Sequence, residues 1–304
     1  MKVHARGAAL LVAMLVAALV ATVAVALAVD QQRWLADVTH RRDQVQAQSL
    51  ALAGIQWARQ ILREDARSSS LDHLGEPWAL SLPSTPIASG SIEGRIDDAQ
   101  ARFNLNALAR DDPTAAVERA RLTRLFASKG VAPTLLDAIA DWVDADPKPR
   151  PNGGEDETYA LAKSPSLAAN ALLVRAAEIT AVRGVTARDF AAIAPFVTAL
   201  PAVTALNVNT ASAAVLAAAL PDLRDEALAG LLADRTRAPF TSVSNFRSRL
   251  PNGVALTDEA SFAVASNFFF VTVVSRQGEA VAQARALLKR EGRNFPAVIW
   301  QTLE

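Results

Sequence analysis

The sequence predicts an α+β protein in which a long N-terminal helix packs on a small antiparallel sheet and a large all-helical domain is inserted. Helical periodicity continues from about residue 8 to about residue 66. Strand-like segments occur at residues 91–97 and again after residue 267, and an alanine-rich stretch broken by Gly and Pro separates them. Because strands flank the helical stretch on both sides, we expect the helices to form an insertion.

The helix begins with an uncharged apolar run, residues 8–29. A helix of that length covers about 33 Å, close to the hydrocarbon thickness of a bilayer. Lys2 and Arg6 precede the run, so the positive-inside rule places the N-terminus in the cytoplasm and the bulk of the chain across the membrane. A plain signal anchor or a secretory signal peptide, cleaved after Ala28, is the alternative, although a signal-peptide core usually spans about 7–15 residues.

After the apolar run the helix is amphipathic. Its apolar side chains recur at intervals of 3, 4 or 7 residues, namely Trp34, Val38, Val45, Leu52, Ile55 and Leu62. This stripe predicts either packing against the sheet or a coiled-coil stalk. Ser68, Gly75 and Pro77 are expected to end the helix, and the segment through Pro86 is predicted to be a loop.

The strands differ in how clearly they are predicted. Residues 91–97 alternate, with Ile92 and Ile96 on one side and charged residues on the other, as in a half-exposed strand. Residues 267–275 have the aromatic and β-branched composition of a buried strand. Residues 280–288 continue less clearly, and residues 297–301 predict a short final strand.

Composition excludes several classes of function. The 304 residues carry 31 Lys and Arg against 31 Asp and Glu and contain no cysteine. The balance does not favour nucleic-acid binding through bulk charge, and disulfides and thiolate metal sites are excluded. The three histidines, His4, His40 and His73, lie at the terminus, on the predicted stem and in a predicted loop, none of them near the acidic residues after 140, and no G-x-S-x-G motif occurs. We therefore predict that the protein is not an enzyme.

An acidic segment is the candidate ion site. Asp141 and Asp144 are spaced i,i+3 near a predicted helix end, followed by Asp146, a Pro/Gly loop, Glu155 and Asp156. If the loop folds back, the carboxylates would repel one another unless a cation lies between them, and calcium accepts such irregular oxygen ligands. The spacing is not that of an EF-hand, so spacing alone favours a solvated acidic loop.

A second segment, residues 206–212, resembles the helix-hairpin-helix repeat of DNA-binding proteins. Such hairpins present backbone N–H groups to phosphate through a Gly-hydrophobic-Gly turn. Here the turn after Pro221 begins with Asp222 and lacks both glycines. We therefore expect a structural role, with Thr210 or Ser212 capping a helix.

One N-terminal and two internal features resemble a known family. Arg6-Gly7 directly before the apolar run resembles the signal of type IV pilins and type II secretion pseudopilins, in which a peptidase cleaves after the glycine. Residues 98–106, DAQARFNLN, resemble a phrase of the general secretion pathway protein K family. Residues 141–159 resemble the D-W-x-D-x-D and G-x-E-D-x-x-Y segment of the same family, with one residue fewer before Glu155.

The resemblance implies a pilin-like fold whose inserted domain is SAM- or helix-hairpin-helix-like. It implies a leader at 1–7, an assembly helix at 8–29, a first pilin-like part at 30–110, the inserted domain at 111–262 and C-terminal strands at 263–304. It also implies cleavage between Gly7 and Ala8, with the new amine methylated, and structural calcium in the inserted domain. The calcium ligands it implies are Asp144, Asp146, Glu155 and Asp156, with Asp141 as a further candidate.

The function that the resemblance implies is that of a minor pseudopilin of a type II secretion system. Such a protein lies in the inner membrane and periplasm of a Gram-negative bacterium, is processed by prepilin peptidase, and joins minor pseudopilins I and J to start a pseudopilus. A tip position is expected, because the fifth mature residue is Val12 where most pilin stems carry Glu. The alternatives are a membrane-anchored periplasmic DNA-binding protein and a calcium-dependent adhesive module.

Overall fold

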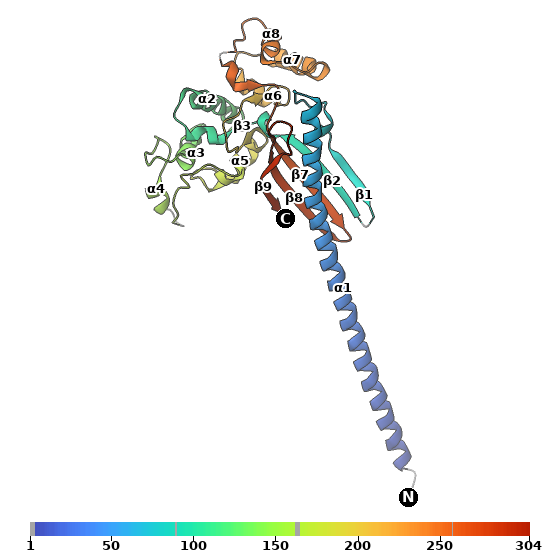
Figure 1. Ribbon diagram of the computed structural model, residues 1–304. Helices are drawn as coiled ribbons and strands as arrows, with labels where there is room; N and C mark the ends of the chain where they lie inside the picture. Colours follow the sequence, from blue (N-terminus) through green and yellow to red (C-terminus); the bar gives the residue numbers. More distant parts are fainter. Residues whose placement is uncertain (1–3, 89, 162–164, 257) are drawn as a thin grey trace.

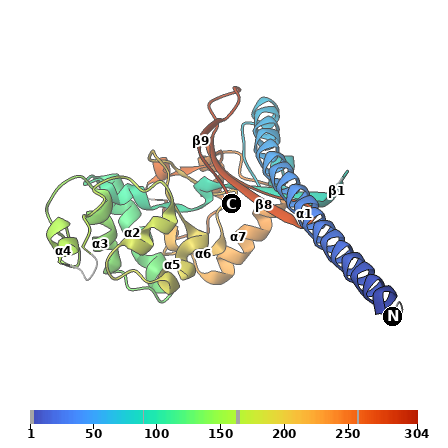
Figure 2. The ribbon, with the colours of Figure 1, turned by 90° about the horizontal axis from the view of Figure 1, so that it is seen from below.

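A long stem, a sheet and a helical segment make up the computed structural model, which describes residues 4–88, 90–161, 165–256 and 258–304 (Figure 1). The stem is helix α1, His4–Ser68, and only its upper part lies against the sheet. Seen from below, the sheet stands between α1 and the helical segment (Figure 2). This is the α+β arrangement that the sequence predicts.

Five antiparallel strands form the sheet in the order β1-β2-β7-β8-β9. Their bounds are β1 Leu82–Ile87, β2 Gly90–Asp98, β7 Phe268–Gln277, β8 Ala280–Lys289 and β9 Ala297–Leu303. The chain leaves the sheet after β2 and returns at β7, and these two strands pair along their whole length, from Gly90 opposite Gln277 to Asp98 opposite Phe269. The helical segment is therefore an excursion between two neighbouring strands, as the flanking strands predict.

Strand β1 corrects the prediction of a loop through Pro86. Residues 82–87 pair with β2, although Pro83 and Pro86 both lie within them. Proline cannot donate a backbone hydrogen bond, so it is tolerated in a sheet where one side of the strand is unpaired. Because β1 is an edge strand, the two prolines do not prevent pairing.

Small side chains let α1 approach the sheet closely. The buried positions of its upper part are Ala47, Ala51, Ile55, Ala58 and Leu62. Gly54 faces β7 so closely that an added Cβ would lie 2.6 Å from a methyl group of Val273. Strand β8 contributes buried alanines at 280, 282, 284 and 286. Because these β8 side chains are short, helix and strand pack closely without a deep layer of side chains between them.

The observed buried stripe of α1 differs from the predicted one. Ile55 and Leu62 are fully buried as expected, but Trp34, Val38 and Val45 are 64%, 45% and 61% exposed. Burial of α1 begins at Ala47, whose carbonyl oxygen accepts a hydrogen bond from the Ser275 hydroxyl, and the β7–β8 turn lies against Asp43 just below. Below that point the apolar side chains of the stem remain on the surface, where another molecule or a membrane can contact them.

The helical segment has its own core, centred on buried aromatic and aliphatic residues such as Phe103, Leu122, Phe126, Phe240 and Phe246. Its helices are α2 Pro113–Ser128, α3 Leu135–Val143, α4 Asp156–Ala160, α5 Ala187–Ile193, α6 Ala213–Ala219, α7 Asp225–Arg237 and α8 Val243–Ser248. Two short parallel pairs also occur, β3 (Phe103–Asn104) with β4 (Val197–Thr198) and β5 (Leu206–Asn207) with β6 (Phe262–Ala263). Short 3-10 turns are η1 Pro77–Ala79, η2 Ala99–Ala101, η3 Leu105–Ala109, η4 Ala176–Ala181, η5 Ala194–Phe196 and η6 Glu259–Ser261.

Candidate functional site

The predicted acidic site lies where α3 ends and a loop leads to α4. Asp141 and Asp144 point to the same place, as their i,i+3 spacing predicts, and Arg150 joins them. Its Nη1 donates to Asp141 Oδ1 at 2.7 Å and also to Asp144 Oδ2. The sequence does not predict this role of Arg150, because an arginine in a Pro/Gly loop looks the same in sequence whether it is solvated or bonded to nearby acids.

The loop between α3 and α4 folds back on the helix, which is the condition that the acidic site requires. The backbone N–H of Arg150 donates to Asp141 Oδ2 at 2.9 Å, and the Asn152 side chain donates to Asp137 Oδ2 at 2.9 Å. Gly153 passes so close to Asp141 that a Cβ would lie 1.9 Å from Oδ2, so only glycine fits there. Asp141 therefore already receives two hydrogen bonds and serves as the anchor of the loop.

Glu155 is the carboxylate without a partner. It is 8% exposed, and neither of its oxygens accepts a hydrogen bond from the residues that the structure describes. Burial, followed by the nearby charges of Asp141 and Asp144, raises the pKa of Glu155 to about 6. Asp144 is 4% exposed, and its Oδ1 is likewise without a donor in the described ranges. A buried carboxylate that lacks a donor is costly, so these oxygens fit a cation.

Asp146 and Asp156 lie at the exposed rim of the site. Asp146 Oδ1 accepts the backbone N–H of Lys148, and Asp156 Oδ1 accepts that of Ala168, both at 2.9 Å. Each carboxylate thus holds a piece of loop with one oxygen. The structure brings Asp141, Asp144 and Glu155 together in the interior and leaves these two acids at the opening.

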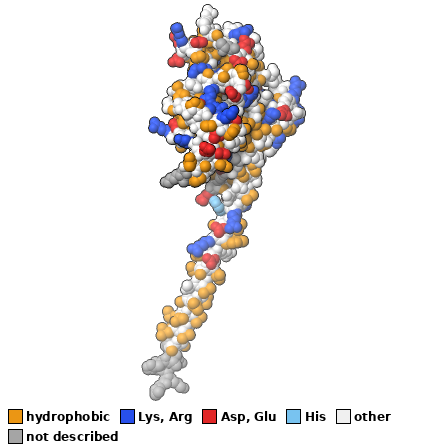
Figure 3. All heavy atoms as spheres, turned by 90° about the vertical axis from the view of Figure 1, so that its left-hand side faces the viewer, with side chains coloured by type: hydrophobic (Ala, Val, Ile, Leu, Met, Phe, Trp, Pro, Cys, Tyr) orange, Lys and Arg blue, Asp and Glu red, His pale blue; other side chains and the backbone are white. Residues whose placement is uncertain are grey.

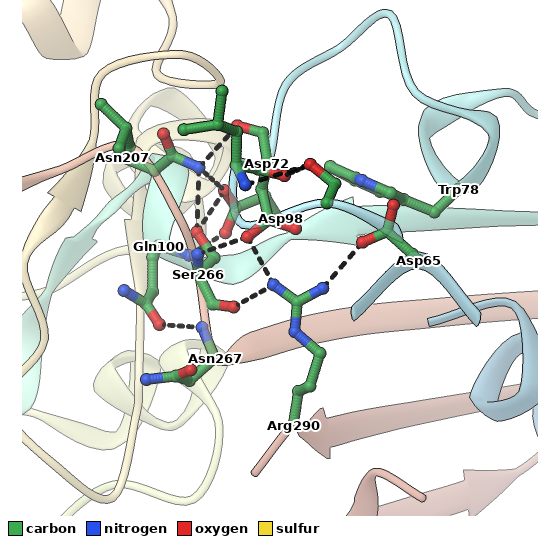
Figure 4. Close-up of polar contacts among 12 residues, drawn as sticks. Asp65, Asp72, Trp78, Asp98, Gln100, Asn207, Ser266, Asn267 and Arg290 are labelled. Atoms are coloured by element: carbon green, nitrogen blue, oxygen red, sulfur yellow. Dashed lines mark hydrogen bonds and ion pairs between the residues drawn. The ribbon is translucent and has the colours of Figure 1, made fainter. Parts of the chain in front are cut away.

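A second acidic cluster lies between the stem and the sheet, and the sequence analysis missed it. Asp65, Asp72 and Glu76 each place a carboxylate oxygen within 4.8 Å of the others, a spacing that could hold a metal ion. Arg290, however, donates to Asp65 Oδ2 at 2.8 Å and to Asp72 Oδ2 at 2.5 Å (Figure 4). Glu76 accepts from the Trp78 indole at 2.8 Å. This cluster carries its own cation, and no ion is needed to explain its burial.

Asp98 connects this cluster to the helical segment. Its Oδ2 accepts hydrogen bonds from Asn207, Thr210 and Ser266 at 2.9, 2.6 and 2.6 Å (Figure 4). Burial raises the pKa of Asp98 to about 6, although these hydrogen bonds oppose the shift. The adjoining Gln100 accepts the backbone N–H of Asn267 at 2.6 Å. The first residues of the 98–106 motif, Asp98 and Gln100, therefore join the end of β2 to the helical segment.

The segment at 206–212 has the structural role that its missing glycines predict. The Ser212 hydroxyl accepts the Val215 backbone N–H and caps α6. Thr210 donates to Asp98 instead of capping the helix. Asn209 donates to the Phe240 carbonyl oxygen at 3.0 Å, and this bond holds two parts of the helical segment together.

The lower stem is the third functional region. Among the described residues, one helix is long and apolar enough to cross a membrane, and its apolar part is not buried in the protein. Hydrophobic side chains cover this part, and charged groups appear only higher on the stem (Figure 3). Gly7 lies within α1, whereas Lys2 and the side chains of residues 4–7 are outside the described part.

A long apolar stem packed on an antiparallel sheet defines a pilin-like protein, and the helical excursion between β2 and β7 sets this one apart. Two family profiles, both described as type II secretion system (T2SS), protein K, match residues 101–202 and 206–265. The chain belongs to this family. The resemblance found in residues 98–106 and 141–159 is thereby confirmed.

Individual relatives agree with the family assignment. Type II secretion system protein K of Klebsiella pneumoniae is 35% identical, covering 98% of this chain and 96% of the relative. The protein of the same name from Pseudomonas aeruginosa is 33% identical, covering 89% and 84%. A chain in the crystal structure of the GspK-GspI-GspJ complex from enterotoxigenic Escherichia coli superposes with a TM-score of 0.77 at 25% identity, covering 88% of this chain and 99% of that one. These findings do not support the alternative of a periplasmic DNA-binding protein.

Proposed function

We propose that this chain is the minor pseudopilin that caps the pseudopilus of a type II secretion system. In this role it assembles with minor pseudopilins I and J and starts the filament that serves protein export across the outer membrane. Its action is structural and needs no catalytic group. The similarity over nearly the whole of a chain solved in a complex of that composition supports the choice of partners.

The size of the helical domain beside the stem is the observation that supports a position at the filament tip. Stem helices in a bundle pack about 8–10 Å apart. A helical domain of about 150 residues, which we assign to residues 111–262, has a radius of gyration near 15 Å. It projects to one side of the sheet (Figure 2), so repeating it on every stem would create clashes. One copy at the end of the filament avoids them.

The stem supports the same position. If cleavage follows Gly7, the fifth mature residue is Val12, which offers no carboxylate to a neighbour's terminal ammonium. A buried ammonium without a partner is costly, and a terminal subunit has no neighbour above it to satisfy.

Antibody labelling of overproduced pseudopili tests this proposal. Labelled antibody against the helical segment should mark one end of each filament, and Val12→Glu should not move the label into the shaft. Purification of the full chain should retain minor pseudopilins I and J. Label along the whole length, or no retention of either partner, would contradict the proposal.

We also propose an inner-membrane protein with a cytoplasmic N-terminus and a periplasmic body, processed between Gly7 and Ala8 and methylated at the new amine. Gly7→Val should leave the precursor uncleaved, because a side chain at this position prevents close approach of the peptidase to the backbone. N-terminal mass measurement, with and without a prepilin peptidase, provides the readout. A fragment that begins after Ala28 would instead indicate an ordinary signal peptide.

The acidic loop is proposed to hold structural calcium. Glu155 and Asp144 provide the buried oxygens that lack donors, and Asp146 and Asp156 complete the set from the rim. Asp141 contributes by anchoring the loop, since both of its oxygens already accept hydrogen bonds. The charge of the ion would offset the repulsion among these acids.

A further inference from the structure

Arg150 is the cation that the protein itself places among the predicted calcium ligands. Its Nη1 bonds Asp141 Oδ1 at 2.7 Å and also bonds Asp144 Oδ2. The Arg150 side chain is 25% exposed, while the Asp141 side chain is fully buried and that of Asp144 is 5% exposed. The guanidinium therefore reaches the two carboxylates from the solvent side.

The path of the loop does not depend on this guanidinium. The backbone N–H of Arg150 bonds Asp141 Oδ2, and Asn152 bonds Asp137 through both its backbone and its side chain. The close passage of Gly153 over Asp141 fixes the same turn. Because these contacts remain when the Arg150 side chain rotates, the guanidinium can leave while the loop keeps its shape.

One guanidinium cannot neutralise the site. Residues 141–156 carry five carboxylates, and Arg150 bonds two of them. Both Glu155 oxygens and Asp144 Oδ1 accept no hydrogen bond in the described part of the chain. A divalent ion that takes oxygens from Asp144 and Glu155 would have to sit beside the Arg150 charge. Two cations at such a distance repel each other strongly in a partly buried site.

We propose that Arg150 is an internal competitor of calcium, whose guanidinium and the ion contend for the same carboxylates. This inference rests on the calcium site proposed above and adds a built-in limit on its affinity. To bind, the ion must displace the guanidinium from Asp144 and turn it toward solvent. The protein thus exchanges one bound cation for another, and the acidic cluster always has a positive charge nearby.

Isothermal titration of the full chain in detergent with calcium chloride tests the competition. Arg150→Met keeps much of the side-chain length and removes the charge, so the dissociation constant for calcium should fall about tenfold or more. Arg175→Met is the matched control, because Arg175 pairs with Glu178 at 3.7 Å and bonds none of the predicted ligands. This control should change affinity by less than about twofold, as expected for an exposed, screened charge.

Chemical modification provides a second readout on the unaltered protein. Calcium should increase the rate at which phenylglyoxal modifies Arg150, measured by peptide mass spectrometry, and should leave Arg175 unchanged. This experiment tests the competition even if Arg150→Met does not fold.

The outcomes separate the two proposals. If the wild type binds calcium but Arg150→Met binds it equally or more weakly, Arg150 organises the site and does not compete. Modification of Arg150 that calcium leaves unchanged or slows would also show that the guanidinium is not displaced. If neither protein binds calcium, the calcium site fails and the competition fails with it.

Discussion

Two acidic clusters in this protein contain the same ingredients but differ in how completely they are bonded. Between stem and sheet, Arg290 pairs with Asp65 and Asp72, and Glu76 lies beside them. In the helical segment, Arg150 pairs with Asp141 and Asp144, and Glu155 lies near them. Arg290 is 8% exposed and also donates to the Ser266 carbonyl oxygen at 2.7 Å. The Arg150 side chain is 25% exposed, and the adjacent Glu155 has no donor among the described residues.

The difference shows that proximity of carboxylates does not by itself define an ion site. The first cluster brings its oxygens closer together, yet its arginine is enclosed and its acids are largely bonded by the protein. Among the described residues the first cluster leaves Asp72 Oδ1 without a donor, whereas the second leaves Asp144 Oδ1 and both oxygens of Glu155 without one and opens to solvent at Asp146 and Asp156. The first cluster therefore fixes the stem to the sheet through Arg290, whereas in the second a cation can replace the guanidinium of Arg150.

The largest effect is expected from Arg290→Met. Removing this cation leaves Asp65 and Asp72 buried without their partner, and breaking a buried ion pair costs about 3–5 kcal/mol of unfolding free energy. Thermal or chemical unfolding of the full chain measures the loss. Arg276→Met is the control, because its pair with Glu93 is exposed and contributes less than about 1 kcal/mol. Similar losses in the two variants would show that the buried junction is not the stabilising joint described here.

Calcium should act on the second cluster alone. At about 100 times its dissociation constant, calcium should raise the unfolding free energy by about 2.7 kcal/mol, because it binds only the folded state. Asp144→Ala and Asp156→Ala should each abolish this gain, whereas Glu279→Ala, an exposed acid at the β7–β8 turn, should retain it. A melting curve that chelator leaves unchanged, in protein first shown to contain calcium, would mean that the loop is merely solvated.

The stability that depends on the first cluster should change with pH. Burial, with the charges of Glu76 and Asp72, raises the pKa of Asp65 from 3.8 to about 7. The folded state then holds a proton that the unfolded state has lost, so stability falls as pH rises from about 4 to about 7 and is level above that. We expect a loss of roughly 1–3 kcal/mol between pH 5 and pH 7.5.

Asp65→Asn provides the control for this pH dependence, because an amide cannot ionise. The variant should lose most of the slope above about pH 6, whereas below that pH Asp98, whose pKa is also raised to about 6, still contributes. The comparison is cleanest on a Glu155→Gln background, which removes another carboxyl whose pKa is raised. An equal slope in both proteins would assign the pH dependence to other groups.

The smallest effect is expected when one carboxylate of each cluster is neutralised, and the change in unfolding free energy should have opposite signs in the two clusters. Without calcium, Glu155→Gln should raise stability by about 1 kcal/mol, because it removes a buried charge that lacks a donor. Asp72→Asn should lower stability, since Arg290 bonds that carboxylate directly. Unfolding in the presence of EDTA measures both changes. A loss of stability in Glu155→Gln would show that this glutamate has a partner and weaken its assignment as a ligand.

Local patterns predicted much of the molecule. The long helix, the strand at 91–97, the buried strand after 267 and the cap at Ser212 are all properties of short segments. The prediction that Asp141 and Asp144 share one face has the same origin, because helical spacing alone places i and i+3 together. The Pro/Gly loop suggested that Glu155 and Asp156 could fold back onto them, the family resemblance named both as calcium ligands, and the structure brings Glu155 beside Asp141 and Asp144.

What the sequence by itself determined is therefore the set of elements and their order: an apolar stem, flanking strands and an alanine-rich helical insertion. Only the tertiary structure decided which residues meet. Strand β1 formed despite its prolines because it lies at an edge. The buried stripe of α1 begins at Ala47 because the sheet ends near this level, with its β7–β8 turn beside Asp43. Arg290 bonds Asp72 across 218 positions of sequence, and no local periodicity reports such a pairing. Periodicity records which face of an element is apolar, whereas the partner of a buried charge depends on how distant segments are brought together by the whole fold.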